Sequence, residues 1–84
     1  MFISGEVQGV GFRHYAKLRA RELGLAGWVQ NLADGRVEVW VEGPETSVEE
    51  MVDWLRIGPP SARVSELEAR EVQPAQLERF EVRR

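Results

Sequence analysis

In the first third of the chain, the spacing of hydrophobic positions changes from a strand-like pattern to a helical one and back. Residues 2–4 read as the end of a short strand. From Phe12 onward, apolar or small side chains recur at spacings of three and four, the period of an amphipathic helix. Gly24 follows, and we expect it to cap the C-terminus of that helix. Residues 28–30 are β-prone and follow a glycine, so this third of the chain predicts strand, helix, strand.

The next segment predicts a hairpin. Asp34-Gly35 is a turn signal, because both central residues of a type I′ turn need a positive φ. After it, Val37, Val39 and Val41 alternate with charged or aromatic residues. Period two over this length indicates a half-buried strand.

A second helix is expected after the hairpin. Thr46 and Ser47 each have a glutamate three residues later, so either one predicts a capping box. Apolar side chains at helical spacing follow across residues 48–55. Gly58 and the two prolines after it should end this helix.

The remaining residues predict two more strands. Residues 64–72 alternate loosely, Pro74 interrupts them, and residues 80–82 form a last short strand. The predicted order is β-α-β-β-α-β with one extra strand. This is the α+β, ferredoxin-like pattern, with an antiparallel sheet and two helices on one face. We expect residues 1–84 to form one domain.

The amino-acid composition argues against several classes of functional site. The chain has no cysteine and a single histidine, which excludes thiol chemistry and argues against a zinc site or a Ser-His-Asp triad. No apolar run approaches the roughly 18 residues of a membrane span, and the start does not read as a signal peptide. We therefore expect a cytoplasmic protein that binds no membrane.

Charge is distributed unevenly. The net charge is −3, which argues against a nucleic-acid partner. Residues 13–21 are basic without an acid, and residues 42–53 are acidic without a base. Two interpretations stay open: the basic segment attracts a small anion, or both segments are solvated helix faces.

The segment GEVQGVGFRH holds Gly5, Gly9 and Gly11 between a strand and a helix N-terminus. Glycines let successive N–H groups turn toward one point, and a helix N-terminus favours an anion there. Arg13 stands in the first helical turn, where its charge opposes the helix dipole unless an anion is bound. Its guanidinium suits bidentate contact with phosphate. A plain glycine turn before an exposed arginine is the alternative interpretation.

Two segments together resemble the signatures of the acylphosphatase family. The first is G-E-V-Q-G-V-G-F-R, and the second, G-W-V-Q-N-L-A-D-G-R-V-E-V, places Asn31 eighteen residues after Arg13. All fixed positions of both signatures are matched. The flanking segments match as well, so the resemblance extends over essentially the whole chain.

The resemblance implies hydrolysis of the carboxyl-phosphate bond of small acyl phosphates, giving a carboxylate and inorganic phosphate, with no metal and no cofactor. It implies that Arg13 binds the phosphate and that Asn31 positions the attacking water. The backbone amides that it implies for the phosphate oxygens are those of Gln8, Gly9, Val10, Gly11 and Phe12. We further expect a monomer.

Other interpretations accompany this one. Asn31 also suits a turn position, and His14 is expected to be exposed at the rim without a catalytic role. The three tryptophans are expected to pack in the sheet or core. Glu6, near the mouth of the loop, is expected to repel phosphate. The alternative function is a non-catalytic anion-binding or regulatory module of the same fold.

Overall fold

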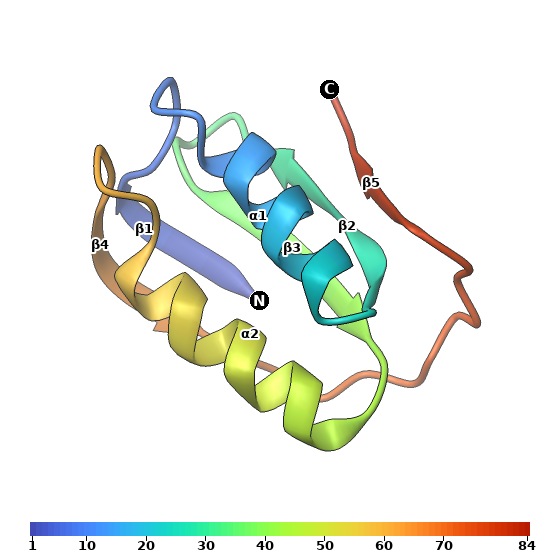
Figure 1. The fold of residues 1–84 in the computed structure, drawn as a ribbon. Helices are drawn as coiled ribbons and strands as arrows, with labels where there is room; N and C mark the ends of the chain where they lie inside the picture. The colour runs from blue at the N-terminus through green and yellow to red at the C-terminus, as the bar shows by residue number, and fades with distance from the viewer.

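The computed structural model describes residues 1–84 and consists of one five-stranded sheet and two helices (Figure 1). The element order agrees with the order predicted from the sequence. The strands are β1 (Phe2–Glu6), β2 (Ala26–Asn31), β3 (Val37–Glu42), β4 (Arg63–Glu68) and β5 (Phe80–Val82), and the helices are α1 (Phe12–Glu22) and α2 (Glu45–Ile57).

The sheet has the strand order β4-β1-β3-β2-β5, and both helices cover the same face of it (Figure 1). The ferredoxin-like fold is therefore confirmed, but the expectation of a wholly antiparallel sheet is wrong, because β5 pairs with β2 in parallel. The other three pairings are antiparallel. The chain leaves β4 at one edge, crosses to the opposite edge and enters β5 in the direction of β2 (Figure 1).

The core lies between the sheet and the two helices. Helix α1 buries Phe12, Ala16 and Ala20, one residue per turn, and the two small side chains let the helix lie close to the sheet. The buried core residues are Ile3, Val7, Phe12, Ala16, Ala20, Leu25, Val29, Val37, Val39, Met51, Leu55 and Phe80.

The end of α1 confirms the role expected for Gly24. Gly24 has φ 70°, its N–H donates to the carbonyl of Arg21, and the N–H of Leu25 donates to the carbonyl of Ala20. These two bonds form a Schellman motif. A residue with a Cβ is strained in this conformation, so the glycine fixes the point where the helix ends.

The capping box predicted for α2 is wrong. The helix begins at Glu45, with Pro44 as its N-cap residue and no side-chain cap. The N–H of Val48 donates to the carbonyl of Pro44 at 3.0 Å. That bond closes the first turn ahead of Thr46 and Ser47, so both candidates lie inside the helix. Gly58, with φ 73°, ends α2 as expected.

The hairpin between β2 and β3 is tight, but it is not a type I′ turn. The N–H of Gly35 donates to the carbonyl of Leu32 at 3.2 Å, so Ala33 and Asp34 are the central residues. Gly35 has φ 95°, whereas Asp34 does not have a positive φ. The Asp34 carboxylate accepts bonds from the backbone N–H and the Nε of Arg36. These bonds support a three-residue loop with the glycine after the turn, a common hairpin form.

Strand β4 ends earlier than predicted, at Glu68. Glu68 pairs with Phe2, the first residue of β1, so the strand ends where its partner does. Residues 69–79, here called the strap, have no regular structure and carry the chain to the far edge of the sheet.

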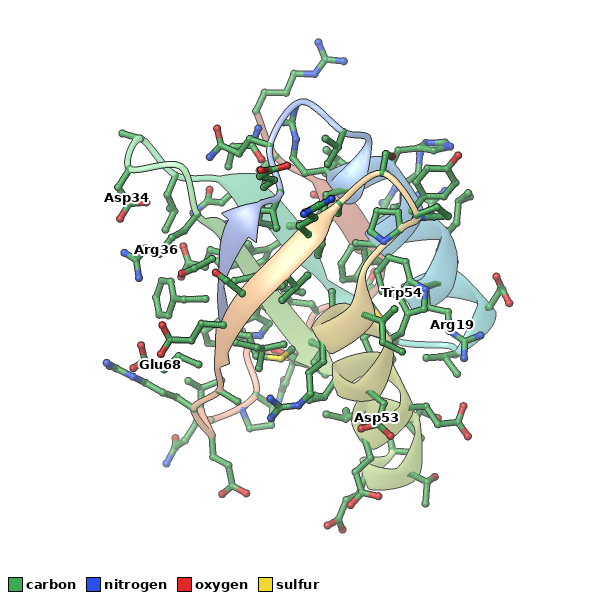
Figure 2. All side chains as sticks on the ribbon, turned by 90° about the vertical axis from the view of Figure 1, so that its left-hand side faces the viewer. Arg19, Asp34, Arg36, Asp53, Trp54 and Glu68 are labelled. Atoms are coloured by element: carbon green, nitrogen blue, oxygen red, sulfur yellow. The ribbon has the colours of Figure 1, made fainter.

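The tryptophans pack as expected. Trp28 and Trp40 stack with their ring centroids 6.0 Å apart, on neighbouring strands. Trp54 of α2 lies against Phe12, also at 6.0 Å. Figure 2 shows Trp54 on the helical side of the molecule and Arg36 and Glu68 on the opposite side, toward the uncovered face of the sheet.

Candidate active site

The sheet topology brings three distant parts of the chain together at one end of the sheet, where three of its strands terminate. Strands β1 and β2 both run antiparallel to β3, and β5 runs parallel to β2, so these three strands share one direction. Their carboxyl ends therefore lie at the same end of the sheet. The loop after β1, the hairpin after β2 and the C-terminus meet there (Figure 1).

The loop after β1, residues 7–11, is held in shape at both ends. Val7 and Phe12, which flank the turn, are each only 1% exposed. Gly9 and Gly11 have φ of 75° and 77°, and Val10 between them does not have a positive φ. Such an alternation is typical of nests, in which successive N–H groups turn toward an anion. A Cβ added at Gly9 would meet nothing within 4 Å, so the space beside this residue is open.

Arg13 extends from the first turn of α1 and is half-buried. Its Nη1 donates to the carbonyl of Arg83 at 3.0 Å. That bond ties the guanidinium to the residue after β5 and leaves its other N–H groups for a ligand. The first turn of α1 has no acidic side chain, so an anion at this helix N-terminus meets both the dipole and the arginine.

Asn31 is the last residue of β2 and is exposed. It pairs with Val37 of β3, immediately before the turn. The side-chain amide of Asn31 therefore lies at the same end of the sheet as the loop.

One cavity of about 650 Å³ joins these features. Of the residues predicted for the site, it is lined by Gly9, Gly11, Phe12, Arg13 and Asn31. Gln8 and Val10 do not line it: the Gln8 side chain bonds to the hairpin, and the Val10 carbonyl accepts a bond from Ser61 Oγ at 3.1 Å.

Three residues that were not predicted for the site also line the cavity, namely Lys17, Val82 and Arg84. Lys17 lies one helical turn after Arg13, and that spacing was a usable signal. Nothing in the sequence pattern placed Val82 and Arg84 there, because their position depends on the parallel entry of β5.

The charge of the cavity suits an anionic ligand. Arg13, Lys17 and Arg84 line it, and no acidic residue does. Glu6, expected near the mouth, is exposed and is not among the lining residues. His14 also lines the cavity; it is exposed, as expected, with its ring edge-on to Tyr15 at 5.3 Å.

A second cavity, of about 770 Å³, lies between the strap and the other end of the sheet, where β2 begins and β3 ends. Its main polar feature is Glu42, whose carboxylate accepts bonds from Trp40 Nε1 and from the backbone N–H groups of Ala75 and Leu77. The Trp40 bond, followed by the backbone bonds, lowers the pKa of Glu42. These bonds hold the strap to the sheet, so this carboxylate has a structural use.

Neither helix combines the length and the apolar character needed to cross a membrane.

Comparisons with known proteins agree on one family. The acylphosphatase family model matches residues 1–82. An acylphosphatase of Trichormus variabilis is 50% identical over 84 residues, covering 100% of this chain and 83% of the relative. A solved acylphosphatase structure from Coxiella burnetii superposes with a TM-score of 0.94 at 41% identity, covering 98% of this chain and 86% of that one.

The structure of an acylphosphatase from Bacillus subtilis superposes with a TM-score of 0.87 at 37% identity, covering 99% of this chain and 93% of that one. Because the family model and these relatives extend over nearly the whole chain, the resemblance seen in the two sequence segments is confirmed. The chain belongs to the acylphosphatase family.

Proposed function

We propose that the cavity formed by the loop, Arg13 and Asn31 is where this chain carries out the reaction of its family, the hydrolysis of acyl phosphates to a carboxylate and inorganic phosphate. The observation that carries the proposal is that Gly9, Gly11, Arg13 and Asn31 all line one cavity. The substrate phosphate lies in the nest, with its oxygens on backbone amides of the loop, among them those of Gly9, Gly11 and Phe12, which line the cavity, and on the guanidinium.

The chemistry requires little beyond positioning and charge stabilisation. A carboxylate is a good leaving group, so no general acid is needed to protonate it. The developing charge on the phosphoryl group is stabilised by preorganised N–H dipoles and by a cation. The loop and Arg13 supply these groups, and we propose that no metal takes part.

Asn31 orients the attacking water. Its side-chain oxygen accepts a hydrogen bond from the water, and its amide N–H₂ donates to a phosphate oxygen. The two signatures thus divide the work: residues 8–13 hold the phosphate, and Asn31 holds the water in line with the scissile bond.

The test is to compare turnover and phosphate affinity in Asn31→Ala. We expect kcat to fall about 10²–10³-fold, as for removal of one preorganised polar group from an active site. The competitive inhibition constant of inorganic phosphate should change much less than kcat, because the loop amides and Arg13, which supply most of the proposed phosphate contacts, are untouched. Asn31 is exposed, so Tm should change little.

Retention of most of the kcat, or loss of phosphate affinity in a folded protein, contradicts this role. Running the assay with and without EDTA tests the proposed independence from metal. The alternative, a binding module without turnover, finds no support in the comparisons, since full-length relatives are named acylphosphatases. Phosphate release above the uncatalysed rate excludes it directly.

We also propose that the active form is a monomer in the cytoplasm, without a nucleic-acid partner. One copy supplies every residue that lines the cavity, so the site does not require a second chain. The net charge of −3 disfavours a polyanionic partner. Sedimentation at assay concentration should give the mass of one chain, 9.6 kDa, and a doubled mass overturns the monomer.

A further inference from the structure

The side chain of Gln8 connects the two halves of the site. Its Nε2 donates to the carbonyl of Leu32 at 2.7 Å and to the carbonyl of Arg36 at 2.9 Å. Leu32 and Arg36 close the hairpin turn, since the N–H of Leu32 donates to the carbonyl of Arg36 at 2.8 Å. One half-buried amide group therefore joins the phosphate loop to both sides of the hairpin base.

The two segments differ in how firmly the rest of the protein holds them. Val7 and Phe12 anchor the loop in the core, and Ser61 binds the Val10 carbonyl. The hairpin tip, residues 33–35, is exposed, as is Asn31 directly before Leu32. The bonds from Gln8 are the side-chain hydrogen bonds that link the base of this turn, Leu32 and Arg36, to the loop.

We propose that the Gln8 side chain is a positioning residue that sets the location of Asn31 relative to the bound phosphate. The inference rests on the proposed function, in which Asn31 orients the water. The main groups assigned to the phosphate, the loop amides and Arg13, lie within residues 8–13, whereas Asn31, which orients the water and donates to one phosphate oxygen, lies on the hairpin. A shift of the hairpin against the loop thus disturbs only the step that uses both.

The first variant is Gln8→Met, which keeps the length of the side chain and removes both donors. We expect kcat to fall about ten- to a hundred-fold, because a misplacement on the order of 1 Å is costly for an in-line attack. The phosphate inhibition constant should change less than about threefold, a split that loss of binding groups does not produce.

Gln30→Met is the matched control. Gln30 lies on the same hairpin and donates from Nε2 to Glu38 Oε1 at 2.8 Å, with no bond to the loop. If general loosening of the hairpin explains the effect, both variants lose kcat. If Gln8 positions Asn31, the control keeps the kcat of the wild type.

Gln8→Glu supplies a second signature and a substitute if Gln8→Met does not fold. As a carboxylate, the new side chain has no donor and faces two carbonyl oxygens, so its pKa is raised by repulsion. Once protonated, it regains one O–H donor. We expect kcat relative to the wild type to rise as pH falls, whereas the same ratio for Gln8→Met stays flat. A flat ratio for Gln8→Glu overturns the proposal.

A double-mutant cycle with Asn31→Ala completes the test. If Gln8 acts through Asn31, adding Gln8→Met to Asn31→Ala costs less than about twofold more in kcat. An equal loss in both backgrounds, or weakened phosphate affinity with kcat intact, overturns the positioning role. If Asn31→Ala alone keeps most of its kcat, the role proposed for Asn31 in the reaction fails instead, and this single variant distinguishes the two failures.

Discussion

The loop of residues 7–11 and the strap of residues 69–79 are both irregular connections, yet they are held in opposite ways. Apolar residues that are almost fully buried, Val7 and Phe12, anchor the ends of the short loop. The strap is almost entirely exposed, and Glu42 holds it by accepting bonds from two of its backbone N–H groups. The proposed phosphate site therefore lies on the segment that the core positions.

The strap still serves the site indirectly. It carries the chain across the sheet so that β5 enters beside β2, and the residue after β5 then accepts the hydrogen bond from Arg13. The difference predicts that changes in the loop affect catalysis, whereas changes in the strap affect stability first.

The largest effect is expected at Arg13, where the loop meets the helix. Arg13→Ala should lower kcat/KM about 10³-fold or more, the scale seen when an arginine that stabilises a transferring phosphoryl group is lost. Arg13→Lys should restore little of this, because a lysine has no planar fork for bidentate contact. Steady-state kinetics on a generic acyl phosphate measure both. Near-normal activity of Arg13→Lys contradicts a requirement for the planar guanidinium.

A smaller effect is expected from Gly9→Ala, with Gly24→Ala as its matched control. Both glycines have similar φ, 75° and 70°, and at both an added Cβ meets nothing within 4 Å. Each substitution should therefore cost about 1–2 kcal/mol of stability through backbone strain.

Only Gly9→Ala places a methyl group in the cavity. It should raise the phosphate inhibition constant about tenfold, which corresponds to roughly 1.4 kcal/mol, whereas Gly24→Ala leaves that constant unchanged. Denaturant unfolding and phosphate inhibition, measured on both variants, separate strain from exclusion of the ligand. Equal inhibition constants count against a phosphate in the nest.

The smallest effect on activity is expected in the strap. Glu42→Gln keeps the shape of the side chain, but it removes the charge and replaces one acceptor oxygen with an N–H₂ group, so the bonds from Trp40, Ala75 and Leu77 cannot all be kept. Tm should fall by a few degrees at neutral pH, while kcat at room temperature changes little. A loss of kcat as large as that of Gly9→Ala contradicts the contrast between the two segments.

The pH dependence of this effect follows from the direction of the shift. Hydrogen bonds lower the folded-state pKa of Glu42 below its ordinary value of about 4.5. Its contribution to stability is therefore present above that value and is lost as pH falls through the folded-state pKa. The difference in Tm between the wild type and Glu42→Gln should shrink below about pH 4.5.

Local sequence features determined much of the molecule by themselves. Glycines at positive φ shape the loop and end α1, because a residue without a Cβ adopts these conformations with little strain. The period of apolar residues gave α1 its first residue, Phe12, and the order of the elements. The two signature segments indicated the family, and the loop and Asn31 meet because β1 and β2 run in the same direction.

The predictions that failed rested on local patterns that other contacts overrode. Thr46 and Ser47 matched a capping pattern, but the bond from Val48 to Pro44 starts the helix earlier. Asp34-Gly35 matched a type I′ turn, but Asp34 bonds to Arg36 within a longer loop. Strand β4 ends at Glu68, beside the first residue of its partner β1, and the alternation in its own sequence does not predict this end.

What only the tertiary structure decided is the set of contacts between segments far apart in the chain. The parallel entry of β5 brings Arg83 to Arg13 across seventy positions, and the Gln8 side chain reaches Leu32 across twenty-four. Arginine and glutamine leave no periodic trace of such partners, because a polar side chain on a loop is compatible with solvent as well as with a distant carbonyl. The sheet order places those carbonyls within reach, and it is fixed by packing of the whole core.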